Sequence, residues 1–344
     1  MILGSVLSLS AQVLPYEPLL NKGQLPEDVT LTPLEKYEQI KGVNPSGENN
    51  VETESFLLET SYLFDNLMRS GYVLFNDSLG EYVNEVLQYI VAENPILRVK
   101  NPRAYILKST EVNAFAIDRG IVFVSLGLLA RLENEAQLAF ILSHELVHIN
   151  ESHVMDEFLE ANRIEEEALG EKLADGEGFE LITELKNSYS REQEIEADTY
   201  GADFFLHTNY AFEELTNVFE LLRYAHLPYA DIPFENASLE KVSTMLPAEL
   251  KLDSVATISV PEEVEEGTHP AISKRKRMMG IRLSSESLAE RVQSIISEER
   301  FENCRQRARM ELPTLYLMQQ QLPQAIYTAY LLNQIYGESS YRSE

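Results

Sequence analysis

The chain has 344 residues, of which 44% are hydrophobic, so it is long and apolar enough for one large domain or two with a packed core. Its net charge of -28 at pH 7 repels phosphate backbones and anionic bilayers, which argues against a nucleic-acid partner. The single cysteine, Cys304, excludes an internal disulfide and a metal cluster built on cysteines.

The N-terminal residues 1–12 form a short apolar run that ends in Ser-Ala-Gln, like the apolar region and cleavage site of a secretory signal. The basic residues that open such a signal are missing, so the run is either a truncated signal or an accidental likeness. We interpret it as a truncated signal, which predicts export. Residues 13–51 are rich in Pro, Gly, Asn and charge and are expected to form an extended arm. No run of about 18 apolar residues occurs, so no integral membrane segment is expected.

Two helices and a small sheet are predicted next. Apolar periodicity favours helices over residues 52–68 and 79–92. Three short β-rich runs follow, AYILKS, NAFAID and GIVFV, and the turn residues Asp118-Arg119-Gly120 join the last two. We expect these runs to form a small antiparallel sheet.

A long helix capped by Asn134 is expected to run to about His153, and it carries HELVH at residues 144–148. Two histidines four residues apart lie on one helix face and can share a metal ion. Glu145 lies off the metal but near its open position, where it can take a proton from a bound water. The surrounding run LAFILSHELVHI is apolar on all sides, which indicates a buried helix.

Burial makes an unpaired HELVH motif unfavourable. Two imidazoles and a carboxylate would each lose several kcal/mol of hydration there, and a metal ion removes that penalty. The alternative is a trio of buried polar residues satisfied by neighbouring side chains. A catalytic zinc site also needs a third protein ligand besides His144 and His148. His153 is the nearest histidine, but it follows His148 by five residues without a glycine turn, so we expect it to pack at the helix end.

The acidic stretch over residues 154–187 has helical periodicity and two glycines in its middle. Two interpretations remain open, a mobile helical pair that acts as a lid and a solvated surface hairpin. Residues 227–268 contain several prolines and are expected to form a long loop.

The run SREQEIEADTYGADF supplies the better third ligand. A capping box starts a helix after Ser190, and Glu194 and Asp198 then share one stripe with two small residues, so that this stripe can approach another helix closely. Glu194 can reach the metal, while Asp198 accepts the second ring N–H of a ligating histidine. Glu196 points to the opposite side and is expected to be solvated. The alternative for Glu194 is a surface acid paired with Arg191.

The ordered set NAFAIDRGIVFVSLGLLARLENEAQLAFILSHELVHINESH, EIEAD and THP resembles the HtpX, BepA and OMA-type zinc metallopeptidases of peptidase family M48, over roughly residues 74–277. The resemblance implies an α+β, mostly helical zincin-like fold with a small antiparallel sheet over the active-site helix. It also implies one zinc ion per chain in a gluzincin-type site, with His144, His148 and Glu194 as ligands. Glu145 would be the general base, and Asp198 would support a ligand from behind.

The same resemblance implies two further features of the active site. Asn113, Ala114 and Phe115 would form an edge strand on which a substrate peptide pairs as an added strand. His269, in the THP run, would act as a reversible regulatory fourth ligand, as a transition-state donor, or only as an exposed loop histidine. Arg275 would bind nearby carboxylates.

The closer likeness is to the soluble, exported BepA-like group, which carries a C-terminal tetratricopeptide (TPR) array. Residues 311–337 are typical of one helix-turn-helix of that kind, although a plain pair of packing helices is equally admissible. The expected organisation is a signal remnant at 1–12, an arm at 13–51, a zinc metallopeptidase domain at 52–287 and a helical, TPR-like segment at 288–344.

These features predict a zinc-dependent metalloendopeptidase that hydrolyses peptide bonds with Glu145 as general base. The resemblance places it in quality control of exported or envelope proteins in a bacterial periplasm, with protein or peptide substrates and with partners at the C-terminal helices. The alternative is a zinc-stabilised chaperone-like or protein-binding module whose site His269 closes permanently. Glu145 argues against that alternative, and against a mononuclear iron oxygenase, because neither needs a general base inside the motif.

Overall fold

The computed structural model describes residues 16–32, 34–36, 38, 58, 61–62, 64–117, 119–153, 189–230, 232–234, 271–283 and 291–337. The predicted signal, the acidic stretch at 154–187 and His269 lie outside these residues. The fold is mostly helical with one small sheet, which confirms the predicted α+β class.

The sheet has four strands in the order β1-β2-β4-β3. Their bounds are Val73–Leu74 for β1, Arg103–Leu107 for β2, Ala114–Ile117 for β3 and Ile121–Ser125 for β4. Strands β3 and β4 form the predicted antiparallel hairpin, but β2 and β4 run parallel, so the sheet is mixed and not antiparallel throughout. The burial of the strands explains this order. Every residue of β4 is buried, as suits an interior strand, whereas β3 is only half buried and takes the edge.

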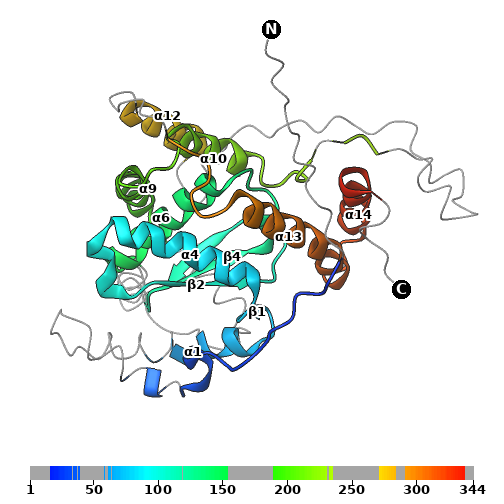
Figure 1. Cartoon of the computed structure of the whole chain (residues 1–344), viewed down its shortest axis with the longest axis horizontal. Helices are drawn as coiled ribbons and strands as arrows, with labels where there is room; N and C mark the ends of the chain where they lie inside the picture. The colour runs from blue at the N-terminus through cyan, green and yellow to red at the C-terminus, as the bar shows by residue number, and fades with distance from the viewer. Residues whose placement is uncertain are drawn as a thin grey trace, which may run out of the picture.

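Helices surround this sheet (Figure 1). Those with bounds inside the described residues are α1 (Glu27–Thr30), α4 (Ser78–Glu93), the 3₁₀ helix η1 (Pro95–Lys100), α5 (Leu126–Leu129), α6 (Glu135–Glu151), α9 (Arg191–Leu206), α10 (Glu213–Arg223), α12 (Ile272–Leu283), α13 (Glu298–Met318) and α14 (Leu322–Tyr336). In Figure 1, α9, α10 and α12 group at one side of the molecule, and α13 and α14 lie at the other. Helix α6 packs against α9, α10, α4 and the sheet, so it is the central helix of this arrangement.

The start of α6 is fixed by a buried carboxylate. Asn134 caps the helix, and Glu135 follows it with a fully buried side chain. The Glu135 carboxylate accepts hydrogen bonds from the hydroxyls of Tyr82 and Tyr210, each at 2.6 Å, and from the backbone N–H groups of residues 295–297. It therefore joins the beginning of α6 to α4 and to the segment that leads into α13.

Helices α6 and α9 approach each other at a glycine. The predicted capping box at Ser190 starts α9, and the stripe of small and acidic residues faces α6. A Cβ atom at Gly201 would lie 2.9 Å from the Cα of His144 and 3.1 Å from its backbone nitrogen. Any side chain at position 201 would therefore push α9 away from the histidine-bearing turn of α6.

The C-terminal and N-terminal segments pack on this body. Helix α13 lies against α4 and α5, and its apolar side chains belong to the same buried core as those of α6. Near the N-terminus, Asp28 pairs with Arg103 of β2.

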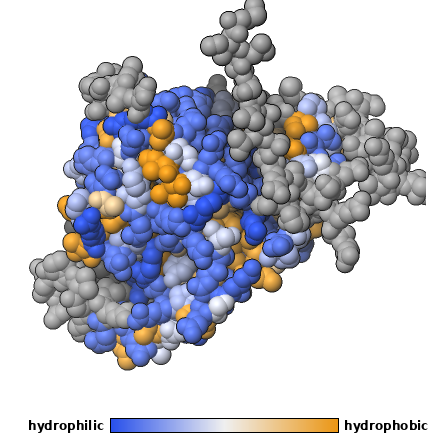
Figure 2. Space-filling view, in the orientation of Figure 1, coloured by the Kyte–Doolittle hydropathy of each residue, from blue (hydrophilic) through white to orange (hydrophobic). Residues whose placement is uncertain are grey.

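The described part of the face seen in Figure 2 is mainly hydrophilic, in keeping with the charge of -28. None of the described helices combines the length and apolarity that crossing a bilayer requires.

Candidate metal centre

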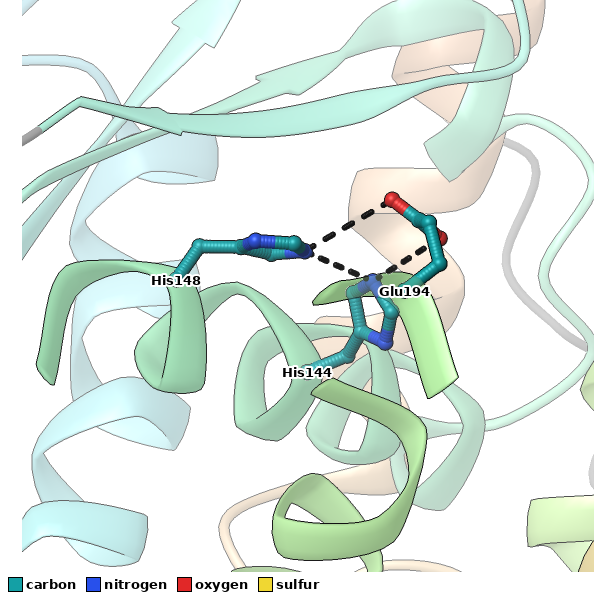
Figure 3. A group of neighbouring side chains, drawn as sticks. All are labelled: His144, His148 and Glu194. Atoms are coloured by element: carbon teal, nitrogen blue, oxygen red, sulfur yellow. Dashed lines mark hydrogen bonds and ion pairs between the residues drawn. The ribbon is translucent and has the colours of Figure 1, made fainter. Parts of the chain in front are cut away.

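Two histidines of α6 and one glutamate of α9 point at a common spot (Figure 3). The Nε2 atoms of His144 and His148 lie 3.1 Å apart. The two carboxylate oxygens of Glu194 each lie 3.7 Å from one of these nitrogens. The structure thus brings together the three residues that the sequence predicted as ligands. Within the described ranges they are the group that meets the geometry of a metal site.

The spacing of these atoms fits a zinc ion. Zinc binds nitrogen and oxygen at about 2.0–2.1 Å in a tetrahedron, which separates the ligand atoms by roughly 3.3 Å. The observed separations of 3.1, 3.7 and 3.7 Å lie on either side of that value. Two imidazoles and one carboxylate are also the donor set of catalytic zinc sites that leave the fourth position to water.

Asp198 supports His144 from behind. One of its carboxylate oxygens lies 3.1 Å from Nδ1 of His144, so Asp198 is placed to receive a proton on Nδ1 while Nε2 is left to the metal. Arg275 of α12 holds the same carboxylate by two hydrogen bonds of 2.7 and 2.6 Å. A third nitrogen of Arg275 lies 3.4 Å from Glu194. The carboxylates of Asp198 and Glu194 are therefore both held by the buried guanidinium of Arg275.

The electrostatics of the three groups agree with this pairing. Burial raises the pKa of Asp198, but the charge and hydrogen bonds of Arg275 outweigh it and leave the pKa below its usual value. Burial likewise opposes protonation of His144, but the hydrogen bond to Asp198 and the charge of Glu194 raise the pKa of that ring. Burial and the neighbouring His144 hold the pKa of His148 well below its usual value. His148 is therefore neutral, the state that binds metals.

A cavity of about 250 Å³ opens beside the metal ligands. The carboxyl side chain of Glu145 lines it, as a general base requires, and the side chain is 5% exposed. Its remaining wall is largely apolar and comes mostly from α6, α10 and α12: Phe140, Ile141, Val218, Phe219, Leu222, Ala225 and Ile272. The metal ligands and Glu145 thus share a cavity with a largely apolar wall.

Strand β3 borders the same cavity as the edge strand of the sheet. The N–H of Ser125 donates to the carbonyl of Asn113, so these two residues form a hydrogen-bonded pair. Because such pairs alternate along antiparallel strands, Phe115 also bonds toward β4, whereas Ala114 turns its N–H and C=O away from β4. Of the three predicted substrate-strand residues, Ala114 is therefore the one whose backbone can meet a peptide.

Tyr189 is a site residue that the sequence analysis missed. Its ring stacks on His148 with 3.7 Å between ring centroids, and its hydroxyl donates to the carbonyl of Ala116 at 3.2 Å. The available signal was its position directly before the capping box at Ser190. The structure also places His153 on the far side of His148, with 2.9 Å between the two Nδ1 atoms.

The sequence comparisons agree with the site. Residues 78–280, more than half of the chain, match the model of peptidase family M48. The beta-barrel assembly-enhancing protease of Escherichia coli (strain K12) is 32% identical over 89 residues, which are 25% of this chain and 18% of that protein. The protein of the same name from Yersinia pestis is 27% identical over 95 residues, which are 28% of this chain and 19% of that protein. The matches thus span less than a fifth of these relatives.

Proposed function

Because the chain belongs to peptidase family M48, whose members are metallopeptidases, we propose that it is a zinc-dependent endopeptidase that hydrolyses peptide bonds. One observation carries the proposal. Two histidine nitrogens and a glutamate carboxylate converge at zinc-like distances, and Glu145 lines the cavity beside them.

His144, His148 and Glu194 would hold the zinc ion. Zinc at this position would polarise the substrate carbonyl and lower the pKa of a bound water. Glu145 takes a proton from the attacking water and then delivers it to the amine nitrogen of the departing peptide. Asp198, which lies 3.1 Å from Nδ1 of His144, would keep the Nε2 atom of that ring directed at the ion.

The cavity suits an extended peptide. The outward N–H and C=O of Ala114 can pair with a substrate strand, which would align its backbone past the metal centre. The apolar wall formed by α6, α10 and α12 then favours an aliphatic or aromatic side chain next to the cleaved bond.

The wider role proposed for the protein is quality control of exported or envelope proteins in a bacterial periplasm. The support is the likeness to beta-barrel assembly-enhancing proteases of bacteria. In this proposal residues 52–287 form the catalytic domain, and residues 288–344, which include α13 and α14, contact protein partners. His269, outside the described residues, is proposed as a regulatory fourth ligand.

The test combines metal analysis with proteolysis. The purified wild type is expected to carry one zinc ion per chain and to cleave casein, whereas Glu145→Gln keeps the zinc and loses cleavage by several orders of magnitude. A zinc-stabilised binding module is the competing function. It would show equal zinc content in both proteins and no cleavage by either, even after His269→Ala removes the candidate plug.

A further inference from the structure

The other ligating histidine, His148, also has a buried neighbour on the ring nitrogen that faces away from the metal, and that neighbour is His153. His153 is buried, with 3% of its surface exposed, and its Nδ1 lies 2.9 Å from Nδ1 of His148. Its other ring nitrogen, Nε2, lies 3.4 Å from the carboxylate of Glu196 on α9. His153 thus bridges the end of α6 and the beginning of α9.

The backbone before His153 is shaped for this contact. Helix α6 ends at Glu151, and its C-cap residue Ser152 adopts the left-handed conformation with φ 58 and ψ 38. For a residue other than glycine this conformation is unfavourable by about 1 kcal/mol or more, so surrounding contacts must maintain it. The turn brings His153 back under the last turn of α6. The side-chain amide of Gln193, in the capping box of α9, donates to the carbonyl of His153 at 3.5 Å.

The position of each proton follows from the metal. A His148 ring that binds zinc through Nε2 carries its proton on Nδ1, where His153 lies. We infer that His153 is a positioning residue of the metal centre: its unprotonated Nδ1 accepts a hydrogen bond from His148 and fixes the tautomer and orientation in which His148 binds zinc. The Nε2–H of His153 then donates to Glu196, which fixes the tautomer of His153 in turn.

The two ligating histidines are therefore supported differently. Nδ1 of His144 faces a buried carboxylate, that of Asp198, whereas Nδ1 of His148 faces the imidazole of His153. Glu196 is 42% exposed, so water can replace it as an acceptor. His153 is buried, and an apolar residue in its place would leave the N–H of His148 without this acceptor. We expect His153 to matter more than Glu196.

The test uses two amides that mimic different edges of the imidazole. In His153→Asn the side-chain amide lies where Nδ1 was and can accept the hydrogen bond from His148. In His153→Gln the longer side chain places the amide where Nε2 was, toward Glu196. His153→Leu removes both functions at similar volume. The zinc affinity of the full chain is measured without substrate, by competition with a chromogenic chelator. Thermal unfolding of the metal-free proteins checks that each variant is folded.

His153→Leu and His153→Gln are expected to weaken zinc binding about 10–100-fold, with His153→Asn close to wild type and Glu196→Ala intermediate. The inference fails if His153→Leu binds zinc within about twofold of wild type, or if the Asn and Gln variants lose affinity equally. It rests on the proposed zinc enzyme, but the two can be told apart. A wild type that binds no zinc overturns both, whereas a wild type that binds zinc, with unaffected His153 variants, overturns only the role of His153.

Discussion

Arg275 and Asp198 form a bidentate ion pair behind the metal centre, with both partners buried. This pair fixes the carboxylate that lies 3.1 Å from Nδ1 of His144. It also links α12 to α9 and so anchors α12 at the metal site.

Removing one partner of this pair should destabilise the fold and weaken the metal site together. Arg275→Leu leaves Asp198 buried without its cation, and we expect a loss of about 3–5 kcal/mol in the free energy of unfolding. Denaturant titration of the metal-free protein measures this change. The matched control is Arg300→Leu, which breaks the exposed pair with Glu85 and should lower stability by less than about 1 kcal/mol. Equal losses in the two variants would contradict the importance of the buried pair.

The close approach of α9 to α6 predicts a sharp effect at one glycine. In Gly201→Ala the new methyl group meets the backbone of His144 at 2.9 Å, so the helices must separate. We expect a loss of about 1–3 kcal/mol in stability and weaker zinc binding, because Glu194 moves with α9. Gly280→Ala on α12 is the control, since no atom lies within 4 Å of its added Cβ. That variant should be neutral or more stable by up to about 1 kcal/mol.

The buried carboxylate of Glu135 predicts a pH dependence of stability. Burial raises its pKa, but hydrogen bonds from the backbone of Ile296 and Ser297 and from two tyrosines lower it below the ordinary value of 4.5. A carboxyl group whose pKa is lower in the folded than in the unfolded state stabilises the folded protein at pH values above the unfolded-state pKa. This stabilisation is lost as the pH falls through the pKa of the folded state.

Glu135→Gln tests this dependence. The variant should be less stable than wild type at pH 7, because the amide N–H group of glutamine would face groups that donate hydrogen bonds to the carboxylate of Glu135. The difference between the two proteins should shrink as the pH falls below about 4.5. Unfolding free energies measured from pH 7 to pH 3 give the result. A difference that stays constant over this range would mean that the carboxylate charge is not what stabilises the start of α6.

The apolar wall of the cavity predicts cleavage specificity. Both Ala225 and Leu222 line the cavity, so Ala225→Leu should narrow it and Leu222→Ala should widen it. We expect the first variant to favour smaller apolar residues beside the cleaved bond and the second to favour larger ones, by roughly 10-fold in relative rate. Mass spectrometry of a digested peptide library measures which residues lie beside the cleaved bonds. Unchanged cleavage profiles in both active variants would show that the wall does not contact the substrate.

The sequence was sufficient for the parts of the site that depend on local helix geometry. HELVH places His144 and His148 on one helix face, and the small residue at Gly201 marks where α9 approaches. Glu194 could be placed because its stripe had to face another helix. The capping box at Ser190 was visible for the same reason, since its two partners lie within one turn.

Features that depend on long-range packing could not be predicted. Strands β2 and β4 are parallel because β4, and not β3, lies next to β2. That order depends on which strand is buried in the interior of the sheet, and a hairpin pattern does not contain that information. The spacing predicted that His153 is not a metal ligand. The contact between its ring and His148 could not be predicted, because it depends on the left-handed turn at Ser152. Tyr189 reaches the site from outside any periodic pattern.

The position of the metal tests the account most directly. Crystals of the zinc-loaded protein, measured on both sides of the zinc absorption edge, should show one anomalous peak per chain about 2.0–2.1 Å from Nε2 of His144, Nε2 of His148 and a carboxylate oxygen of Glu194. In Glu194→Ala crystals the peak should weaken or disappear. A wild-type protein without a peak between these residues, or a Glu194→Ala protein with a fully occupied one, would contradict the proposed zinc centre.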